Sequence, residues 1–342
     1  MSFYKLDKNT ERILKLLEKL SIQEKDKTST EGIRKYTQAN LESRILKKLY
    51  YKLSKNVYTK TFIIPVLDAQ IIGYYFEKIS NKSLSGLNPL IIFYHGGGWT
   101  LSSLEKYSSF CNHICDVTGA SVIMADYRLS PQNKFPIPLK DCYSTLLWAA
   151  KGARYWKTDP DKIYVMGDGA GGNLAAEVSR FARDKKGPKI AGQILLCPVT
   201  DGRMRTKSYE TYTDCPTLKV KDMINFIHNY QREPKDILNV NFSPLLAKDH
   251  SRLPETLIAI AEYDPLHDDG KLYAQALSSA DTPVKLLNCN KTIHGFYQFP
   301  KAEKSKELIY AISQFVGGRR LNQIEMISKK DFEKQKKQEL KH

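Results

Sequence analysis

Short β-rich runs alternate with helical patterns from about residue 57 onward, and this alternation constrains the fold more than any other feature of the chain. Three β-rich runs come first, and further runs then precede helical segments. Such alternation is typical of a mostly parallel sheet with helices on both faces. The strand-like runs are 57–64, 70–76, 89–94, SVIMA, KIYVM, QILLC, TLIAIA and PVKLLNC, and the helical segments lie near 138–155, 171–186, 268–280 and 303–316.

Composition and charge exclude several classes of protein. The chain is 42% hydrophobic and 26% charged, as globular proteins are, and it has no repeat or low-complexity segment. Its net charge of +16 raises the hypothesis of nucleic-acid binding. However, residues 1–56 carry +7 and residues 318–342 carry +4, so the excess lies mainly at the two ends. A Lys-rich terminal helix is usually a solvated face, and we therefore predict no specific nucleic-acid partner.

Neither a membrane span nor a disulfide framework is expected. No apolar run approaches the roughly 18 to 20 residues that cross a bilayer, and the first 20 residues lack an apolar signal core. We therefore expect a cytoplasmic protein. The six cysteines form no C-x-x-C pair, which favours reduced thiols. Cys111 and Cys115 could face one another on a helix, but the sequence gives no further sign of a metal site.

Chemistry-bearing residues follow four of the predicted strands. In a parallel sheet these strand ends meet at one edge, where ligands and catalytic groups gather. Consecutive glycines let backbone N–H groups point at a bound atom, as an oxyanion hole requires, although a plain flexible turn explains them equally well. The four segments are His95-Gly96-Gly97-Gly98-Trp99, Gly167-Asp168-Gly169-Ala170-Gly171-Gly172-Asn173, Glu262-Tyr263-Asp264-Pro265-Leu266 and Ile293-His294-Gly295-Phe296.

The second segment is the most specific of the four. A strand, a G-x-?-x-G turn and a helix together form the nucleophile elbow, in which small flanking residues permit a sharp and strained turn. The central position of an elbow is Ser, Cys or Asp in an enzyme. In this chain it is Gly169.

With these motifs the sequence resembles the hormone-sensitive-lipase branch of the α/β-hydrolase fold, which contains bacterial carboxylesterases, arylacetamide deacetylase and the plant gibberellin receptors. The resemblance covers roughly residues 50–317 and includes the order nucleophile, acid, histidine. It implies an α/β-hydrolase fold, with a mostly parallel central sheet of the eight-strand class flanked by helices and a helical cap. The motifs are HGGGW at 95, DYRLSP at 126, FPIP at 135, GDGAGGN at 167, AEYDPLHDDG at 261 and HGF at 294.

The resemblance also assigns roles to individual residues. Asp264 would orient His294 and stabilise its charged form, and His294 would act as general base and then as general acid. The nucleophile falls on Gly169, where the family has serine. The implied oxyanion hole consists of the backbone N–H groups of Gly97, Gly98 and Ala170, with His95 and Gly96 shaping that loop.

Each catalytic assignment has a structural alternative. Taken alone, His294 could be a satisfied buried histidine, and Asp264 could be a helix N-cap before Pro265. The polar residues Asp126 and Arg128 are interpreted as structural, because a buried loop needs its polar groups satisfied.

Three substitutes for the missing hydroxyl remain open. Asp168 could attack if the turn were shifted by one residue. Ser102 or Ser103 could supply a hydroxyl, although the following helix needs an N-cap there. Water activated by His294 could attack directly but slowly, because triad enzymes that lose a member retain only about 10³ to 10⁴ over water.

We divide the chain into three parts. Residues 1–56 form an N-terminal helical cap segment, residues 57–320 form the α/β-hydrolase domain with a cap insertion at about 202–245, and residues 321–342 form a charged C-terminal tail. A capping box at Thr28–Glu31 predicts a second N-terminal helix that runs towards Leu53. The cap would supply most of the substrate pocket, and its candidate pocket aromatics are Tyr36, Tyr50, Tyr51, Tyr209, Tyr212 and Phe226.

The sequence thus predicts a serine-type carboxylic ester hydrolase for short or medium acyl esters, without a cofactor or metal. Because Gly169 replaces the nucleophile, we expect this version to be inactive or nearly so. The alternatives are a non-catalytic small-molecule receptor on the same scaffold, or a scaffolding protein that uses its basic ends. The family also makes a homodimer possible.

Overall fold

A computed structural model describes residues 4–21, 48–80, 86–102 and 104–326. Its centre is an eight-stranded sheet in the order β1-β2-β4-β3-β5-β6-β7-β8. The pairs β1–β2 and β2–β4 are antiparallel, and the remaining pairs are parallel. The strands are β1 (Val57–Pro65), β2 (Gln70–Lys78), β3 (Asn88–Tyr94), β4 (Ser121–Asp126), β5 (Thr158–Asp168), β6 (Gly192–Leu196), β7 (Glu255–Tyr263) and β8 (Val284–Ile293).

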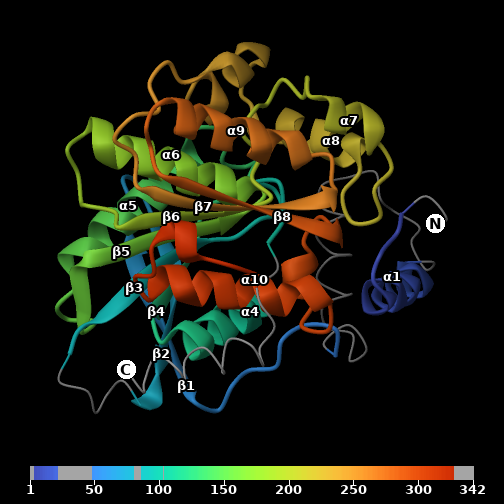
Figure 1. Cartoon of the computed structure of the whole chain (residues 1–342). Coiled ribbons are helices and arrows are strands. Elements are labelled where there is room, and N and C mark those ends of the chain that lie inside the picture. Colours follow the sequence, from blue (N-terminus) through green and yellow to red (C-terminus); the bar gives the residue numbers. More distant parts are fainter. Residues whose placement is uncertain (1–3, 22–47, 81–85, 103, 327–342) are drawn as a thin grey trace.

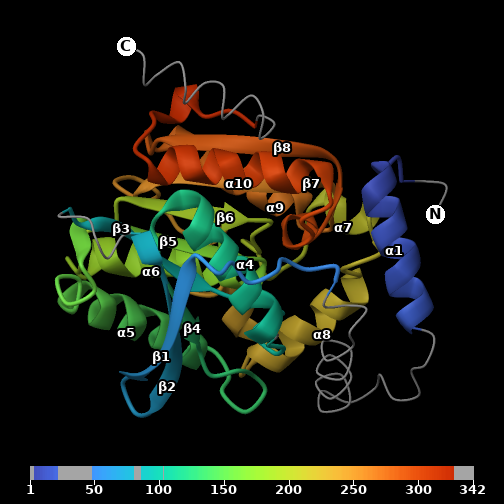
Figure 2. The ribbon, with the colours of Figure 1, turned by 90° about the horizontal axis from the view of Figure 1, so that it is seen from below.

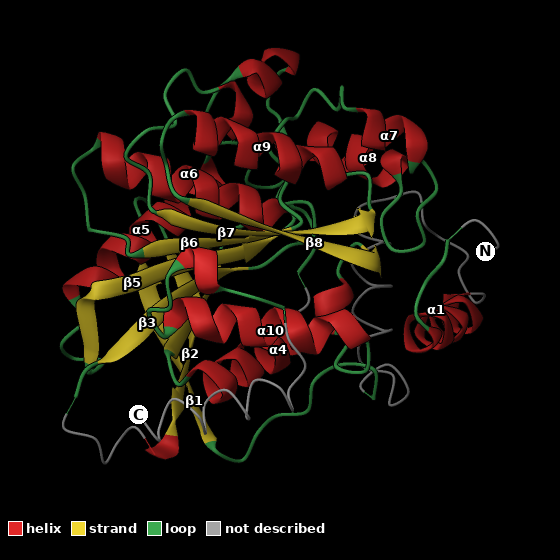
Figure 3. Ribbon diagram, viewed as in Figure 1, coloured by secondary structure: helices red, strands yellow, loops and turns green. Residues whose placement is uncertain are grey.

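Helices cover both faces of this sheet (Figures 1 and 3). The helices α5 (Ile137–Lys151), α6 (Ala170–Asp184) and α9 (His267–Ser279) enclose one hydrophobic core, which includes Leu146, Leu174 and Leu277. The helices α4 (Leu104–Thr118) and α10 (Glu303–Val316) enclose the other, which includes Phe110 and Ile312. The predicted fold, an α/β-hydrolase with a mostly parallel sheet, is confirmed.

Further short helices lie between β6 and β7, where the cap insertion was expected. They are α7 (Lys207–Thr211), α8 (Val220–Tyr230) and the 3-10 turns η2 (Pro234–Leu238) and η3 (Pro244–Leu246). At the other end of the chain, α1 (Lys8–Ser21) lies beside the end of β8 (Figure 2). Leu14 of α1 packs with Cys215, Tyr263 and Ile293.

Two predicted segments fall wholly or partly outside the described residues. Most of the second N-terminal helix does so, and its last stretch, residues 48–53, is turn and loop rather than helix. Tyr51 in that stretch donates to the carbonyl of Tyr297, so its side chain belongs to the core instead of a substrate pocket. Most of the predicted tail also lies outside. Its described part contains η5 (Leu321–Gln323) and Ile324, which is buried.

Arg128 has the structural role expected of it, with partners that the sequence did not identify. Its guanidinium binds both carboxylate oxygens of Asp141, at 2.9 and 2.7 Å, and it also binds Asp68 at 2.7 Å. Asp126 is not one of these partners, and burial raises its pKa to about 6. Within the described ranges, none of the helices combines the length and the apolar character needed to cross a membrane.

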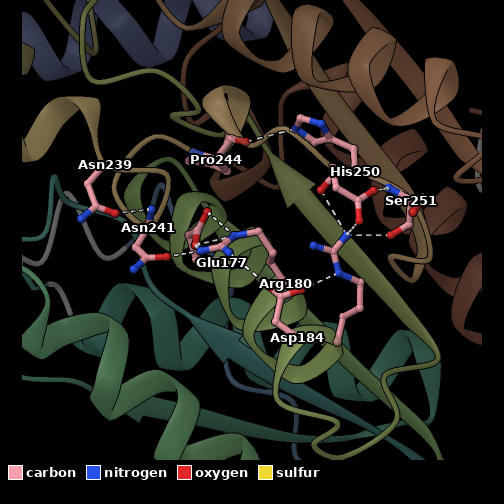
Figure 4. Close-up of polar contacts among 10 residues, drawn as sticks. Glu177, Arg180, Asp184, Asn239, Asn241, Pro244, His250 and Ser251 are labelled. Carbon is pink, nitrogen blue, oxygen red and sulfur yellow. Dashed lines mark hydrogen bonds and ion pairs between the residues drawn. The ribbon is translucent and has the colours of Figure 1, made fainter.

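A buried polar network fixes α6, the helix that begins at the candidate site, against residues 239–251 (Figure 4). Arg180 pairs with the fully buried Glu177 at 2.7 Å and also binds Asp184 and Asn241. Arg183 donates to the carbonyl of Ser251 at 2.7 Å. Burial raises the pKa of Glu177 to about 7, although the charge of Arg180 opposes this rise.

We expect Arg180→Met to lower the free energy of unfolding by about 3 kcal/mol at pH 8, because the Glu177 charge then stays buried without its partner. A carboxyl whose pKa is raised by folding stabilises the fold at low pH, and this contribution is lost as the pH rises through that pKa. At pH 6 Glu177, with a pKa of about 7, is mostly protonated and has little charge to leave unpaired. The destabilisation caused by Arg180→Met should therefore be smaller at pH 6 than at pH 8, which denaturant titrations at both pH values would measure. Adding Glu177→Met should recover most of the loss. An equal loss at both pH values would contradict this reading of Glu177.

Candidate active site

Gly169 forms the turn between β5 and α6, and its backbone has a conformation that would strain any other residue. Its φ is 52° and its ψ is −112°, a conformation that costs a non-glycine residue about 1 to 3 kcal/mol. Three hydrogen bonds hold the turn in place. The Gly169 N–H donates to the Leu196 carbonyl at 2.9 Å, and the Gly169 carbonyl accepts from Asn173 and Val199, both at 3.1 Å.

The glycines on either side of the turn are required by close backbone contacts. A Cβ on Gly167 would lie 2.1 Å from the carbonyl oxygen of Gly171. A Cβ on Gly171 would lie 2.0 Å from the carbonyl oxygen of Tyr94 at the end of β3. The G-x-G-x-G spacing therefore allows the helix to start directly against the neighbouring strand, as the elbow motif predicts.

His294 and Asp264 meet beside this turn. Nδ1 of His294 lies 2.8 Å from Oδ2 of Asp264, whose side chain is fully buried. The other carboxylate oxygen of Asp264 accepts the N–H of Leu266 at 2.9 Å. Asp264 can therefore both cap the following turn and orient the histidine, because one of its oxygens binds Leu266 and the other binds His294. Thr217 of the cap donates to the His294 carbonyl at 2.8 Å.

The ring of His294 also faces Gly169. A Cβ on Gly169 would lie 3.6 Å from Nε2 and 3.6 Å from Cε1 of His294, which is an ordinary van der Waals distance. Nε2 is the nitrogen that Asp264 does not bind. A small side chain at position 169 therefore has room, and its terminal atom would stand next to a nitrogen that can take its proton.

The electrostatic setting of His294 favours its charged form. Burial by itself lowers the pKa of His294, but the charge of Asp264 and the hydrogen bond to it raise the pKa by more, and Asp168 adds to that rise. The net pKa lies above its ordinary value of about 6.5. Stabilising an imidazolium is what a general base needs while it carries a proton.

The glycine loop after β3 packs directly against the elbow. A Cβ on Gly96 would lie 2.8 Å from the carbonyl oxygen of Asp168. Gly97 and Gly98 both have positive φ, 108° and 60°. Ala170 is the first residue of α6, where backbone N–H groups have no intrahelical carbonyl to bind. The structure thus brings the three residues of the predicted oxyanion hole to the same end of the sheet.

His95 is positioned to support this loop. Its ring stacks on Tyr127 at a centroid distance of 4.3 Å, and Tyr127 donates to the His95 carbonyl at 2.7 Å. Nδ1 of His95 lies 2.8 Å from the carbonyl of Gly96. Burial lowers the pKa of His95 to about 4, so the ring is neutral.

The structure disfavours Asp168 as a substitute nucleophile. Its Oδ2 accepts hydrogen bonds from Tyr107 at 3.0 Å, Tyr297 at 3.1 Å and Gln298 at 3.0 Å, which hold the carboxylate in place. Oδ1 of Asp168 and the hydroxyl of Ser102 are both buried without a partner among the described residues. Ser103 lies outside the described residues.

Comparison with known proteins decides the family. A family model described as the alpha/beta hydrolase fold matches residues 91–298, which is more than half of the chain. The chain belongs to this α/β-hydrolase family. The esterase of Pyrobaculum calidifontis has a similar structure, with a TM-score of 0.82 and 30% identity over 92% of this chain and 99% of that one.

Curated relatives of this α/β-hydrolase include named esterases. An arylesterase of Saccharolobus solfataricus is 35% identical over 64% of this chain and 71% of its own length. A carboxylic ester hydrolase, LipN, of Mycobacterium tuberculosis is 39% identical over 62% of this chain and 58% of its own length. A putative α/β hydrolase of a mimivirus is 35% identical, and the match spans 61% of each chain.

The structure adds a contact between the cap and the glycine loop that no sequence motif identified. Phe226 of α8 packs on the backbone of Gly98, where a Cβ would lie 2.1 Å from its ring. The cap therefore touches the predicted oxyanion loop.

The other candidate pocket aromatics have different surroundings. Tyr209 is buried, Tyr50 stacks on Phe299, and Tyr212 packs edge-on against Tyr263. Tyr36 lies outside the described residues.

Cys197, which directly follows β6, lies next to the histidine and its carboxylate. Cys197, Asp264 and His294 each place one potential metal ligand within 4.8 Å of the others. Burial raises the pKa of the Cys197 thiol, and the charge of Asp264 raises it further. Because metals bind the thiolate, this setting favours a protonated thiol over a metal ligand. No sequence pattern singles out Cys197, since a cysteine at a strand end is ordinarily a core residue.

The residues that follow Asp264 in sequence have other tasks. Nδ1 of His267 lies 2.7 Å from the Ala261 carbonyl. Asp268 accepts the N–H of Ser208 at 2.9 Å, and Asp269 accepts the N–H of Thr200 at 2.8 Å. Asp264 is therefore the carboxylate of this segment that serves His294.

Proposed function

We propose that this chain is a serine-type carboxylic ester hydrolase scaffold for short or medium acyl esters, in which Gly169 occupies the place of the nucleophile. The unaltered chain, with Gly169, is then inactive or nearly so. One observation carries the proposal. The His294 ring, bound to Asp264 through Nδ1, presents its other nitrogen to a turn that has room for a hydroxymethyl group and lacks one. The esterase relatives support the same chemistry.

The geometry defines the steps that a hydroxyl at position 169 would carry out. His294 would take its proton through Nε2 while the oxygen attacks the ester carbonyl. The resulting oxyanion would be held by the N–H groups of Gly97, Gly98 and Ala170. His294 would then return the proton to the leaving alcohol, and water would release the acid by the same route. Without that hydroxyl the first bond cannot form, although the remaining groups are in place.

The activity of the unaltered chain tests the proposed loss of catalysis. With p-nitrophenyl acetate and butyrate we expect at most the roughly 10³ to 10⁴ over the uncatalysed rate that remains when a triad lacks a member. A kcat/KM in the usual enzyme range, about 10⁴ M⁻¹s⁻¹ or higher, would show that another group, such as Ser102, is the nucleophile.

The pH dependence of the Gly169→Ser variant should follow His294. The general base must be neutral, and Asp264 raises the pKa of His294 above its ordinary value of about 6.5. Activity should therefore fall as the pH drops through that raised pKa, so that the acidic limb of kcat/KM lies above pH 6.5. Asp68→Asn, at an exposed ion pair with Arg128, should leave the limb unchanged. An acidic limb well below pH 6 would contradict the assignment of His294.

The alternative proposal is a non-catalytic small-molecule receptor. It is favoured by Gly169 itself, which removes the nucleophile and relieves backbone strain while the dyad and the loop remain. The contact between Phe226 and Gly98 gives a bound ligand a direct route to the cap. Under this alternative, the Gly169→Ser variant folds but stays inert, and a ligand in the pocket changes the protection of α8 in hydrogen exchange.

A further inference from the structure

A hollow lies at the end of the sheet opposite to the candidate active site. Its volume is about 350 Å³, near the lower end of the roughly 300 to 1,000 Å³ that is typical of small-molecule pockets. Its lining comes from the end of α6 and from the two segments that lead into β6 and β7. The elbow follows β5 and Asp264 follows β7, so both lie at the other end of these parallel strands. The hollow is therefore separate from the site described above.

The charged residues that line the hollow are all cations. They are Arg183 near the end of α6, Lys186 and Lys189 in the turn before β6, and Arg252 before β7. Among the described residues of the lining, none is acidic. Because four positive charges surround the same small space, the hollow attracts anions.

The guanidinium of Arg183 is already fixed. Its Nε donates to Asp184 at 2.8 Å, and its Nη1 donates to the carbonyls of Ser251 at 2.7 Å and Asp249 at 3.1 Å. Its Nη2 forms no hydrogen bond with any residue that the structure describes. Two N–H groups of Arg183 are thus left for a ligand, and little side-chain entropy remains to be lost when they bind it.

The other three cations are not committed to strong contacts. Lys186 and Arg252 are exposed, and neither forms an ion pair within the described ranges. Lys189 pairs with Asp161 at 3.3 Å, but these side chains are 71% and 72% exposed, so water and salt screen the pair. An anion in the hollow can therefore bind these side chains without breaking a strong contact.

The last carbonyls of α6 do not oppose an anion as free acceptors. The carbonyls of Ala182 and Arg183 accept the N–H groups of Gly187 and Lys186, at 2.8 and 3.2 Å. These bonds close the end of the helix on itself. The cations of the lining are therefore free to determine which ligand the hollow takes.

From this arrangement we propose that the hollow binds a small polyanion with a diphosphate group. Arginine and lysine are the side chains that bind phosphate oxygens, and four of them on three segments exceed what a single carboxylate needs. Free pyrophosphate and a nucleoside diphosphate share this chemistry. The proposal is independent of ester hydrolysis, because it uses none of the residues at the elbow. The apolar lining that could contact an attached organic group consists of Ala182, Pro188, Ile190, Leu253 and Pro254.

Calorimetric titration of the full chain with pyrophosphate and with acetate, at low ionic strength, tests the site. We expect one site with a Kd of about 10 to 100 µM for pyrophosphate. Acetate should not saturate the chain below about 10 mM, because its single charge engages only part of the site. Raising the NaCl concentration to about 0.5 M should weaken pyrophosphate at least tenfold. Failure of pyrophosphate to saturate the chain below about 10 mM would overturn the proposal.

Titration with ADP distinguishes the two sources of the diphosphate. ADP carries the same group on a nucleoside, which the apolar lining could contact. Binding of ADP at least tenfold tighter than that of pyrophosphate would support the proposal and identify a nucleotide site. Equal or weaker binding of ADP, beside saturation by pyrophosphate, would support it and identify a site for the free anion.

Two double variants locate the binding. Lys186→Gln combined with Arg252→Gln removes two exposed charges that have no described ion-pair partner, so it should fold normally and weaken pyrophosphate at least tenfold. Lys185→Gln combined with Lys248→Gln removes the same net charge from exposed positions outside the lining and should weaken it less than about threefold. Unchanged affinity in the first double variant, or equal weakening in both, would contradict the proposal.

Discussion

We expect the Gly169→Ser variant to hydrolyse p-nitrophenyl butyrate at least about 10³-fold faster than the unaltered chain, in line with the cost of losing a triad serine. The hydroxyl would stand beside Nε2 of His294, since a Cβ at this position lies 3.6 Å from that nitrogen. Asp264 already binds His294, and the loop of Gly97 and Gly98 already lies at the same end of the sheet. Initial rates of both proteins, measured side by side, check the expectation.

Gly169→Ala is the matched control. It adds the Cβ without the hydroxyl, so it should gain no activity. Both substitutions place a side chain at a φ of 52°, and thermal melts of both should show a loss of about 1 to 3 kcal/mol relative to the unaltered chain. A serine variant that melts cooperatively but remains as slow as the alanine variant would contradict the esterase proposal and favour the receptor alternative.

In the Gly169→Ser background, Asp264→Asn should lower kcat by about 10⁴-fold. The Asn amide can donate to Nδ1 of His294, which moves the ring proton to Nε2 and removes the base. The carbonyl of the same amide can still accept from Leu266, so the turn that Asp264 holds should survive. Steady-state rates give kcat, and a melt checks that the fold is retained.

Asp269→Asn is the comparison for this second effect. Asp269 is equally buried, but it bonds the N–H groups of Thr200 and Asp201 and not His294. Its replacement should affect stability far more than kcat. A fall in kcat of similar size in both variants would mean that the Asp264 result reports general damage to this segment.

The sheet and the catalytic motifs could be predicted from sequence because their signals are local. Each strand is a short run of β-forming residues, and one glycine of the elbow is required by a contact within a few residues of the turn. Gly167, for example, leaves no room for a Cβ beside Gly171. Such constraints act along the chain and leave a fixed spacing in it.

The remaining features depend on contacts between distant segments of the chain. Such contacts produce no fixed spacing of residues in the sequence, so a motif search does not find them. Phe226, for example, contacts Gly98, which lies 128 positions earlier in the sequence. The sequence predicts Tyr51 in the cap, but Tyr51 lies in the core, where its hydroxyl contacts Ser305 on a distant segment of the chain. Aromatic residues serve a pocket and a core equally well, so residue type alone could not separate the two.

Covalent labelling tests the central claim most directly. The claim is that every part of an esterase site is present except the hydroxyl at position 169. An activated p-nitrophenyl phosphonate reacts with an activated serine by forming an oxygen–phosphorus bond and releasing p-nitrophenol. Intact-mass measurement should show one adduct on the Gly169→Ser variant, located at position 169, and none on the unaltered chain. A folded variant without an adduct, or an adduct on Ser102 of the unaltered chain, would contradict the account.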